Sequence, residues 1–330
     1  MESALALHYT LEMSQANTII QRPIFLLGAT SIVGYNVAAR RDAALFPYVT
    51  SRSRHATAAQ WPRFLLDDAD AVARWCAALP AEATVLYCDA VCDVAKCEEK
   101  PDWAREINVG NLRRVLAALP ADARLVYVSS DHVFGNDGHY DETAVPCPVS
   151  KYGAIRAEAE RLALAHPGAL LIRYGLPIGP SIDGKSGHAD WLRYRLRAGL
   201  PVTMIEDESR TAMPSVLLAD RVIALARSPH TGTRHITANR LMPRVELARA
   251  LHRHFDLPGD LAISYRHLQP APHLGRIHIV TRHTDPLAAP LPSPLECLDF
   301  IADSLRVSNC VFDNPVYQPH VAKLASQVLV

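Results

Sequence analysis

IFLLGATSIVG, residues 24–34, is the stretch that decides the fold. Its first four residues are all apolar, which is typical of a strand buried on both faces of a parallel sheet. Gly28 allows a tight turn, and Gly34 allows the next helix, expected from about Ile32 to Arg41, to lie close to the strand. The N–H groups that begin such a helix can hold a pyrophosphate. The stretch therefore predicts a dinucleotide loop formed by Gly28, Thr30, Ser31, Ile32, Val33 and Gly34, with a plain strand-to-helix turn as the alternative.

Short apolar runs recur along the chain, separated mostly by helical stretches. They are Tyr48 to Thr50, Phe64 to Leu66, Val85 to Cys88, Leu125 to Val128 and Leu170 to Ile172. Alternating strands and helices predict an α/β fold, a Rossmann-type doubly wound parallel sheet. One long helix is expected from Glu98 to Leu119, with its apolar stripe formed by Trp103, Ile107, Leu112, Val115, Leu116 and Leu119.

The alternation breaks after Tyr174, where glycines and prolines become frequent. We interpret this part as a smaller C-terminal substrate lobe over the carboxyl edge of the sheet. The expected domains are an N-terminal extension (1–20), a dinucleotide-binding domain (21–176, with a returning segment near 216–240) and the substrate lobe (177–215 and 241–330). The returning segment is expected to form a helix from Val216 to Arg227.

The composition restricts the class of protein. The 34 Lys and Arg residues balance the 34 Asp and Glu residues, so the net charge is zero and gives no reason to expect binding to nucleic acid or to an anionic membrane. Seven cysteines without paired spacing favour a reducing compartment, and Cys88, Cys92 and Cys97 lack the second cluster that a metal site needs. The first twenty residues do not resemble a signal peptide, and no long apolar window follows, so we expect a cytoplasmic protein without a metal.

The residues after the second strand indicate which dinucleotide is bound. A carboxylate there holds the 2'-hydroxyl of NAD, whereas arginine accepts the 2'-phosphate of NADP. The chain has Arg52, Ser53 and Arg54 and no acid, which favours NADP. The alternative is that both arginines are only solvated. Asp67 and Asp68 follow the expected third strand, where they could contact the adenine or cap the next helix.

Two further motifs place hydroxyl groups where a carbonyl could react. LVYVSSDHVFG (125–135) ends a strand with Ser130, and PVSKYGAIRAEAE (148–160) begins a helix with Tyr152. A carbonyl that accepts hydride develops negative charge on oxygen, so it needs a proton donor and a hydrogen-bond donor. Arg156 lies one helical turn after Tyr152 and can stabilise its phenolate.

With these motifs the chain resembles the extended short-chain dehydrogenase/reductase family, specifically the dTDP-4-dehydrorhamnose reductase-like members of its NAD-dependent epimerase/dehydratase group. The resemblance runs from about Arg22 to Leu225 and rests on GATSIVG (28–34), DVAKCEEKPDWAREINVGN (93–111), SSDHVFG (129–135) and PCPVSKYGAIRAEAE (146–160). It implies a catalytic set of Ser130, Tyr152 and Arg156, supported by Asn108, and a cofactor contact from Tyr174. It also implies substrate contacts from Val91, Arg210 and Pro214.

Three features depart from the family pattern. Arg156 replaces the usual lysine; it keeps the charge but cannot deprotonate to join a proton relay. Cys88, Asp89 and Ala90 replace a run of small residues beside the cofactor, and Asp89 is either a paired acid or the cap of the next helix. Related sugar dehydratases have an acidic pair where this chain has Asp131 and His132. These two residues are candidate acid–base groups, although His132 could equally be a surface group.

The sequence thus predicts an NADPH-dependent reductase of a keto group, with a nucleotide-activated sugar as the expected substrate. Two alternatives remain open: an epimerase or dehydratase that returns the hydride, and a non-catalytic dinucleotide-binding protein that regulates a partner. The expected partner is a small-molecule substrate rather than nucleic acid or membrane, and a homodimer is left open.

Overall fold

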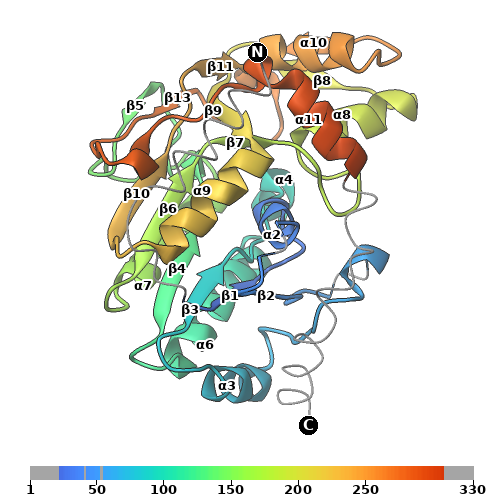
Figure 1. Cartoon of the computed structure of the whole chain (residues 1–330). Helices are drawn as coiled ribbons and strands as arrows, with labels where there is room; N and C mark the ends of the chain where they lie inside the picture. Colours follow the sequence, from blue (N-terminus) through green and yellow to red (C-terminus); the bar gives the residue numbers. More distant parts are fainter. Residues whose placement is uncertain (1–21, 41, 53–54, 308–330) are drawn as a thin grey trace.

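The structure is a computed structural model, and it describes residues 22–40, 42–52 and 55–307. Six parallel strands form the central sheet in the order β10-β6-β4-β3-β1-β2 (Figure 1). Their bounds are β1 Ile24–Leu27, β2 Leu45–Tyr48, β3 Thr84–Tyr87, β4 Arg124–Val128, β6 Leu170–Tyr174 and β10 Gly232–Ile236. The predicted Rossmann-type parallel sheet is confirmed.

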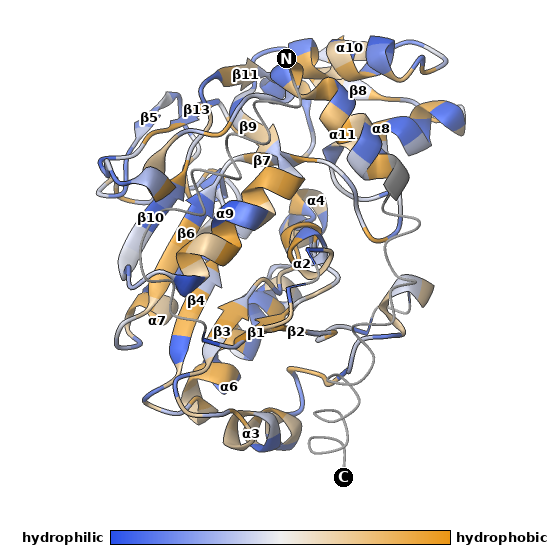
Figure 2. Cartoon of the chain, in the orientation of Figure 1, coloured by the Kyte–Doolittle hydropathy of each residue, from blue (hydrophilic) through white to orange (hydrophobic). Residues whose placement is uncertain are grey.

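Helices cover both faces of this sheet because its side chains alternate between two apolar cores. Ile24 and Leu26 pack on the face covered by α2 (Ile32–Ala38) and α9 (Ser215–Arg227). Phe25 and Leu27 point to the other face, which is covered by α3 (Ala69–Ala77), α6 (Asn111–Ala118) and α7 (Lys151–Leu164). Figure 2 shows the hydrophobic character of these strands.

The predicted third strand is wrong. At Phe64–Leu66 the structure has only an isolated bridge, from Val49 to Arg63, and the preceding strand β2 ends at Tyr48 instead of Thr50. Phe64 and Leu66 are nevertheless buried, because the Phe64 ring stacks on Trp75 with centroids 5.2 Å apart. Their apolar character serves packing against α3 rather than a strand ladder.

The single helix predicted from Glu98 to Leu119 is divided into several. The structure has α4 (Val94–Glu99), α5 (Pro101–Arg105), a π-helix (Glu106–Gly110) and then α6. Pro101 has no N–H to continue α4 and instead begins α5, a position that proline favours. Trp103 leaves the expected stripe and is 37% exposed, with Lys96 Nζ 4.5 Å from its ring.

A second sheet lies beyond the carboxyl ends of the central strands (Figure 1). It comprises β11 (Leu241–Pro243), β9 (Ser209–Pro214), β13 (Arg276–Ile279) and β5 (Gly138–Tyr140), with β7 (Leu176–Ile178) also paired to β9 and a separate pair of β12 (Ala262–Ser264) and β8 (Thr203–Ile205). Nearby are α8 (His188–Arg197), α10 (Arg244–His254) and α11 (Leu298–Val307), which share an apolar core. Short 3-10 helices occur at Ala56–Ala58, Asp131–Val133, Arg266–Leu268, Pro286–Ala288 and Pro294–Glu296.

The chain returns from this second region to the central sheet through α9, one residue longer at its start than predicted. Arg40, just after α2, donates from Nε to Asp220 Oδ1 on α9 at 2.6 Å. The predicted domain limits stay a prediction, and the extension at 1–20 lies outside the described residues. Within those described, no helix is both long enough and apolar enough to cross a membrane.

Candidate functional site

The glycine loop joins β1 to α2 by a close approach of backbones. Gly28 has a φ of +86°, and a Cβ added there would lie 2.5 Å from the backbone nitrogen of Asp89. A Cβ on Gly34 would lie 2.1 Å from the Gly28 carbonyl oxygen. Both positions therefore require glycine. Ser31 occupies the third-glycine position and caps α2, because its Oγ accepts from Gly34 N at 3.1 Å.

The other loop residues have different surroundings. Thr30 Oγ1 lies 3.3 Å from Ser51 Oγ, in the segment that follows the neighbouring strand β2. Ile32 is half-buried, whereas Val33 is buried in the apolar core, so only its backbone can contact a cofactor. The uncovered N–H groups at the start of α2 remain suited to an anion.

Two of the residues expected to select the cofactor, Arg52 and Asp67, form an ion pair with each other. Arg52 Nη2 donates to Asp67 Oδ2 at 2.5 Å, and the two side chains are 73% and 49% exposed. Asp68 caps α3 by accepting from Ala71 N at 2.9 Å, so the capping alternative holds for this residue. Ser53 and Arg54 lie outside the described residues. Contact of Arg52 with a 2'-phosphate stays a prediction.

Asp89 is a paired acid rather than a helix cap. Thr50 Oγ1 donates to Asp89 Oδ1 at 2.9 Å, and burial raises the pKa of this carboxyl against the opposing effect of Thr50. The next helix is capped by Asp93, which accepts from Lys96 N at 3.1 Å. The neighbouring Cys88 is buried and Ala90 half-buried. A polar group thus underlies the glycine loop where small residues are usual in the family.

The start of α7 is held tightly against the loop that follows β4. Ser150 caps the helix, accepting from Gly153 N at 3.0 Å. A Cβ on Gly153 would lie 2.1 Å from the His132 carbonyl oxygen, so glycine permits this approach. As a result the rings of Tyr152 and His132 meet edge to face, with centroids 5.1 Å apart. The structure brings the tyrosine of one motif to the histidine of the other.

Tyr152 and Arg156 place a phenol and a guanidinium one turn apart on α7. Burial raises the pKa of Tyr152, and the Arg156 guanidinium opposes that rise, so the phenol is neutral at pH 7. Arg156 is itself buried; it donates to the Val128 carbonyl oxygen and lies 4.8 Å from the Tyr127 ring centroid. Its Nε and Nη1 have no partner among the described residues. Two buried donors are thus available to a ligand.

Asn108 acts on the backbone of Val91. Its Oδ1 accepts from Val91 N at 2.8 Å, and its Nδ2 donates to Val91 O at 3.0 Å. Because Asn108 lies in the π-helix, its side chain fixes the segment that follows β3. This double contact leaves Val91 with its backbone groups occupied and its side chain half-buried.

Ser130 is oriented by its two successors. Its Oγ donates to Asp131 Oδ1 at 3.3 Å and accepts from His132 N at 3.3 Å. Burial lowers the pKa of His132 well below its usual value, and its Nδ1 is buried without a partner among the described residues. His132 is thus a neutral group beside Tyr152, and the surface alternative is wrong.

A buried ionic network adjoins this loop. Arg210 on β9 donates from Nε to Asp131 Oδ2 at 2.6 Å and lies 3.4 Å from Glu208 Oε1. Glu208 also accepts from Arg244 Nη1 at 2.8 Å and contacts His273 Nδ1 at 2.9 Å. Sequence reasoning missed these last two partners because they lie 36 and 65 residues from Glu208 in the chain.

The remaining predicted contacts lie at the ends of β9 and β6. Pro214 is buried at the junction of β9 and α9. Tyr174 ends β6, and burial raises the pKa of its phenol well above the usual value. Within the part of the chain that the structure describes, no three or more His, Cys, Asp or Glu side chains gather to hold a metal ion.

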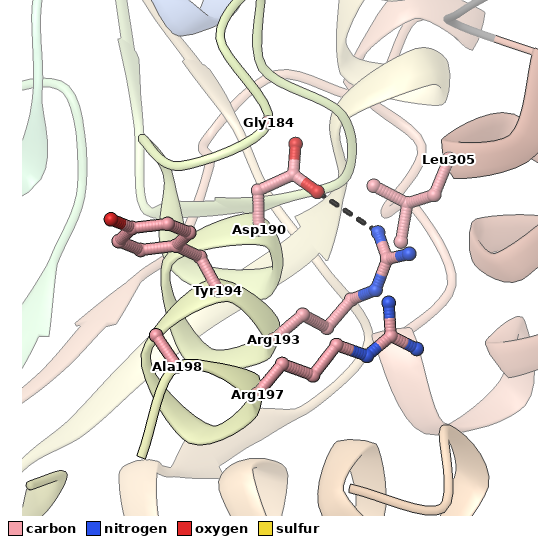
Figure 3. Close-up of a pocket in the computed structure, with 7 residues that line it drawn as sticks. All are labelled: Gly184, Asp190, Arg193, Tyr194, Arg197, Ala198 and Leu305. Carbon is pink, nitrogen blue, oxygen red and sulfur yellow. Dashed lines mark hydrogen bonds and ion pairs between the residues drawn. The ribbon is translucent and has the colours of Figure 1, made fainter. Parts of the chain in front are cut away.

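A pocket of about 430 Å³ lies between α8 and α11 (Figure 3), and none of the predicted catalytic residues lines it. Its lining residues are Gly184, Asp190, Arg193, Tyr194, Arg197, Ala198 and Leu305. Arg193 donates to Asp190 Oδ1 at 3.0 Å, and Asp190 is further held by Ser181. None of these seven residues belongs to the sequence motifs above. This pocket is therefore separate from the predicted site around Tyr152.

Known proteins match part of this chain. A probable low-salt glycan biosynthesis reductase, Agl14 of Haloferax volcanii, is 29% identical over 47% of this chain and 53% of its own length. The methionine adenosyltransferase 2 subunit beta of Rattus norvegicus is 27% identical over 56% of this chain and 57% of its own length. A dTDP-4-dehydrorhamnose reductase of Mycolicibacterium smegmatis is 35% identical over 33% of this chain and 34% of its own length. The chain spans about half the length, or less, of these curated relatives.

Solved structures share the fold. The Bacillus anthracis dTDP-4-dehydrorhamnose reductase in complex with NADP has a TM-score of 0.72 at 18% identity, over 86% of this chain and 99% of its own. The Thermotoga maritima UDP-glucose 4-epimerase with UDP-glucose has a TM-score of 0.72 at 16% identity, over 87% and 99%.

The family itself is assigned from the sequence. The model of the RmlD substrate binding domain matches residues 22–293, which include the glycine loop, the Ser130 loop, the Tyr152 helix and the ionic network around Arg210. With the parallel sheet and these elements at its carboxyl edge, the chain belongs to the RmlD substrate binding domain family, within the extended short-chain dehydrogenase/reductase group.

Proposed function

We propose that this chain is an NADPH-dependent reductase of a keto group on a nucleotide-activated sugar. The observation that carries the proposal is the pairing on α7 of Tyr152, a buried neutral phenol, with Arg156, a buried cation that has two unpartnered donor nitrogens. A neutral phenol is the form that can protonate a carbonyl oxygen during reduction. The nearby guanidinium then stabilises the phenolate that remains.

The described residues fit a bound dinucleotide. The loop between Gly28 and Gly34 has no Cβ at its two closest backbone approaches, and α2 begins directly after it. Its N–H groups would hold the pyrophosphate. Arg156 would donate to the nicotinamide ribose. Arg52 would exchange its contact with Asp67 for hydrogen bonds that it donates to a 2'-phosphate. NADPH, when bound, supplies the hydride.

Each polar residue then has one role. Ser130 Oγ turns its single proton from Asp131 Oδ1 to the substrate carbonyl oxygen and so polarises it, and Tyr152 Oη delivers the proton to that oxygen. Asp131 is unsuited to this role because both of its carboxylate oxygens accept from Arg210. Neutral His132, in contact with the Tyr152 ring, can relay a proton to the tyrosinate after turnover, giving up the proton on one ring nitrogen as the other nitrogen takes one up from solvent.

The names of the relatives support a reductase over the alternatives. One of them is named as a probable glycan biosynthesis reductase and another as a dTDP-4-dehydrorhamnose reductase, and one solved neighbour is a complex with NADP. A second candidate, a regulatory protein that binds a dinucleotide without turnover, is favoured by the similarity to methionine adenosyltransferase 2 subunit beta and by Arg156 in place of lysine.

The test follows NADPH absorbance with a panel of dTDP- and UDP-linked keto sugars, including dTDP-4-dehydrorhamnose. A reductase consumes NADPH in proportion to product, whereas an epimerase or dehydratase shows no net consumption. Tyr152→Phe should lower the rate at least about a hundredfold while NADPH affinity stays within about twofold, because only the proton donor is lost. NADPH binding without turnover of any sugar would support the regulatory candidate instead.

A further inference from the structure

His188, the first residue of α8, is a buried histidine whose role the catalytic set leaves open. It is 7% exposed, and its Nδ1 lies 3.2 Å from Arg244 Nη2. A guanidinium only donates hydrogen bonds, so Nδ1 must be the acceptor. Burial, together with the charge of Arg244, lowers the pKa of His188 well below its usual value, which keeps the ring neutral. The single ring proton is therefore on Nε2.

This Nε2–H group has no acceptor among the described residues. A buried donor without a partner destabilises a folded protein, and such groups in native structures usually meet a ligand or an ordered water. The adjoining Arg244 Nε is also buried and unpartnered in this part of the chain. The start of α8 adds backbone N–H groups, since no side chain caps this ten-residue helix. The site offers donors in excess, which suits an oxyanion.

The position of His188 relates it to the proposed active site. A Cβ added to Gly187 would lie 2.7 Å from Ile32 Cδ1, so the start of α8 touches the start of α2 in the glycine loop. In the other direction, Arg244 binds Glu208, which lies 3.4 Å from Arg210, the partner of Asp131. His188 thus lies between the cofactor loop and the residue next to Ser130.

The pocket of Figure 3 is a separate feature of the same helix. At 100° per residue, Asp190, Arg193, Tyr194 and Arg197 share one face of α8, and His188 lies roughly 170° around the helix from the middle of that face. His188 therefore faces away from that pocket and belongs with the catalytic side of the helix.

We propose that His188 is a substrate-specificity residue, which donates from Nε2 to a phosphate oxygen of the sugar nucleotide. This inference rests on the proposed function and deepens it. The diphosphate of the substrate, rather than that of the cofactor, is the favoured partner for two reasons. First, the N-terminus of α2 is already assigned to the pyrophosphate of the cofactor. Second, Arg244 binds Glu208, which contacts Arg210, the partner of Asp131, so His188 lies on the side of the predicted catalytic loop.

The probe is inorganic pyrophosphate, titrated calorimetrically into protein already saturated with NADP⁺ so that the cofactor site is filled. We expect pyrophosphate to bind, and His188→Phe to weaken it about tenfold, the effect of one hydrogen bond to a charged group. His188→Gln, which retains an N–H donor, should stay within about twofold of the parent. The matched control His267→Phe, at an exposed histidine, should change nothing.

A second measurement uses the parent protein alone, in case His188→Phe does not fold. In ¹⁵N-histidine NMR spectra, the Nε2–H signal that is missing from His188→Gln should shift when pyrophosphate is added to the NADP⁺ complex. An unmoved signal, equal affinity in His188→Phe, or no binding once NADP⁺ is present would each overturn the proposal. Failure of the proposed function is seen separately, as absence of NADPH turnover while pyrophosphate binding still depends on His188.

Discussion

Arg210 and Asp131 form a two-point ion pair that is buried from solvent on both sides, with Arg210 Nε 2.6 Å from Asp131 Oδ2. It links β9 of the second sheet to the loop that carries Ser130. Burial raises the pKa of Asp131, and Arg210 opposes this by favouring the ionised form. The pair therefore holds the Ser130 loop in place instead of supplying a proton.

Replacing one partner of this pair should destabilise the protein strongly. Arg210→Met leaves the Asp131 carboxylate buried without its cation, and breaking such a pair typically lowers the free energy of unfolding by about 3–5 kcal/mol. Urea titration followed by circular dichroism measures the loss. The double variant Asp131→Asn with Arg210→Met should recover much of the stability, because no buried charge is left unpaired. Arg52→Met, which breaks an exposed pair, is the control and should cost at most about 1 kcal/mol.

Asp67 should oppose the binding of a 2'-phosphate. It occupies Arg52 at 2.5 Å, but an exposed ion pair is weak and the phosphate can displace it. Asp67→Asn should therefore raise the preference for NADPH over NADH by about threefold, roughly the worth of one such pair, whereas Arg52→Ala should lower it. Fluorescence titration with both cofactors measures the ratio, and NADH affinity serves as the internal control. An unchanged ratio in both variants would remove Arg52 from cofactor selection.

Local sequence signals predicted the elements that carry the proposed catalytic residues. The apolar run before Gly28 and the spacing of Ser130 and Tyr152 depend on residues close together in the chain, so their strand, loop and helix were correctly anticipated. The same local reasoning failed at Phe64–Leu66. Burial against Trp75 and burial in a strand give the same apolar pattern, and only the tertiary structure distinguishes them.

Contacts between distant segments explain the rest of what was missed. Asp89 preceded a helix and was open to interpretation as its cap, but its partner Thr50 lies 39 residues earlier. His188 and Arg244 are 56 residues apart, and neither belongs to a recognisable motif. Such pairs arise from how β9, α8 and α10 pack over the sheet, which no periodicity encodes.

His235 should make the protein less stable in mild acid. Its Nδ1 donates to Val280 O at 2.9 Å, and its Nε2 faces Arg173 at 3.4 Å, while Glu142 accepts from its backbone N–H. Burial lowers the pKa of His235 to about 4. The unfolded chain takes up the proton near pH 6.5, well before the folded one, so the free energy of unfolding falls as pH falls from 6.5 to about 4.

Unfolding titrations between pH 4 and 7.5 measure this dependence. His235→Gln should flatten it by up to about 1.4 kcal/mol per pH unit, although the variant is less stable at pH 7. His132 and His188, whose pKa values are also lowered by burial, retain their share of the slope. His267→Gln, at an exposed histidine, is the control and should keep the parent's slope. An equal slope in parent and His235→Gln would contradict the assignment.

Arg156→Lys distinguishes a working arginine from a retired site. Lysine keeps a cation one turn from Tyr152, so if Arg156 serves the reaction, the rate with NADPH and a nucleotide-sugar ketone should stay within about tenfold of the parent. Arg156→Met, which has a similar stem and no charge, should lower the rate at least about a hundredfold, because the phenolate loses its partner.

If the site does not turn over its substrate, lysine alone should create no activity, since Asp89 and Ser31 still shape the cofactor pocket. A large gain with lysine would contradict both outcomes and would mean that the contact of Arg156 with the Val128 carbonyl restrains a competent enzyme. We expect the first result, because only five of the 34 cationic residues are lysines and arginine is the prevailing cation throughout the chain.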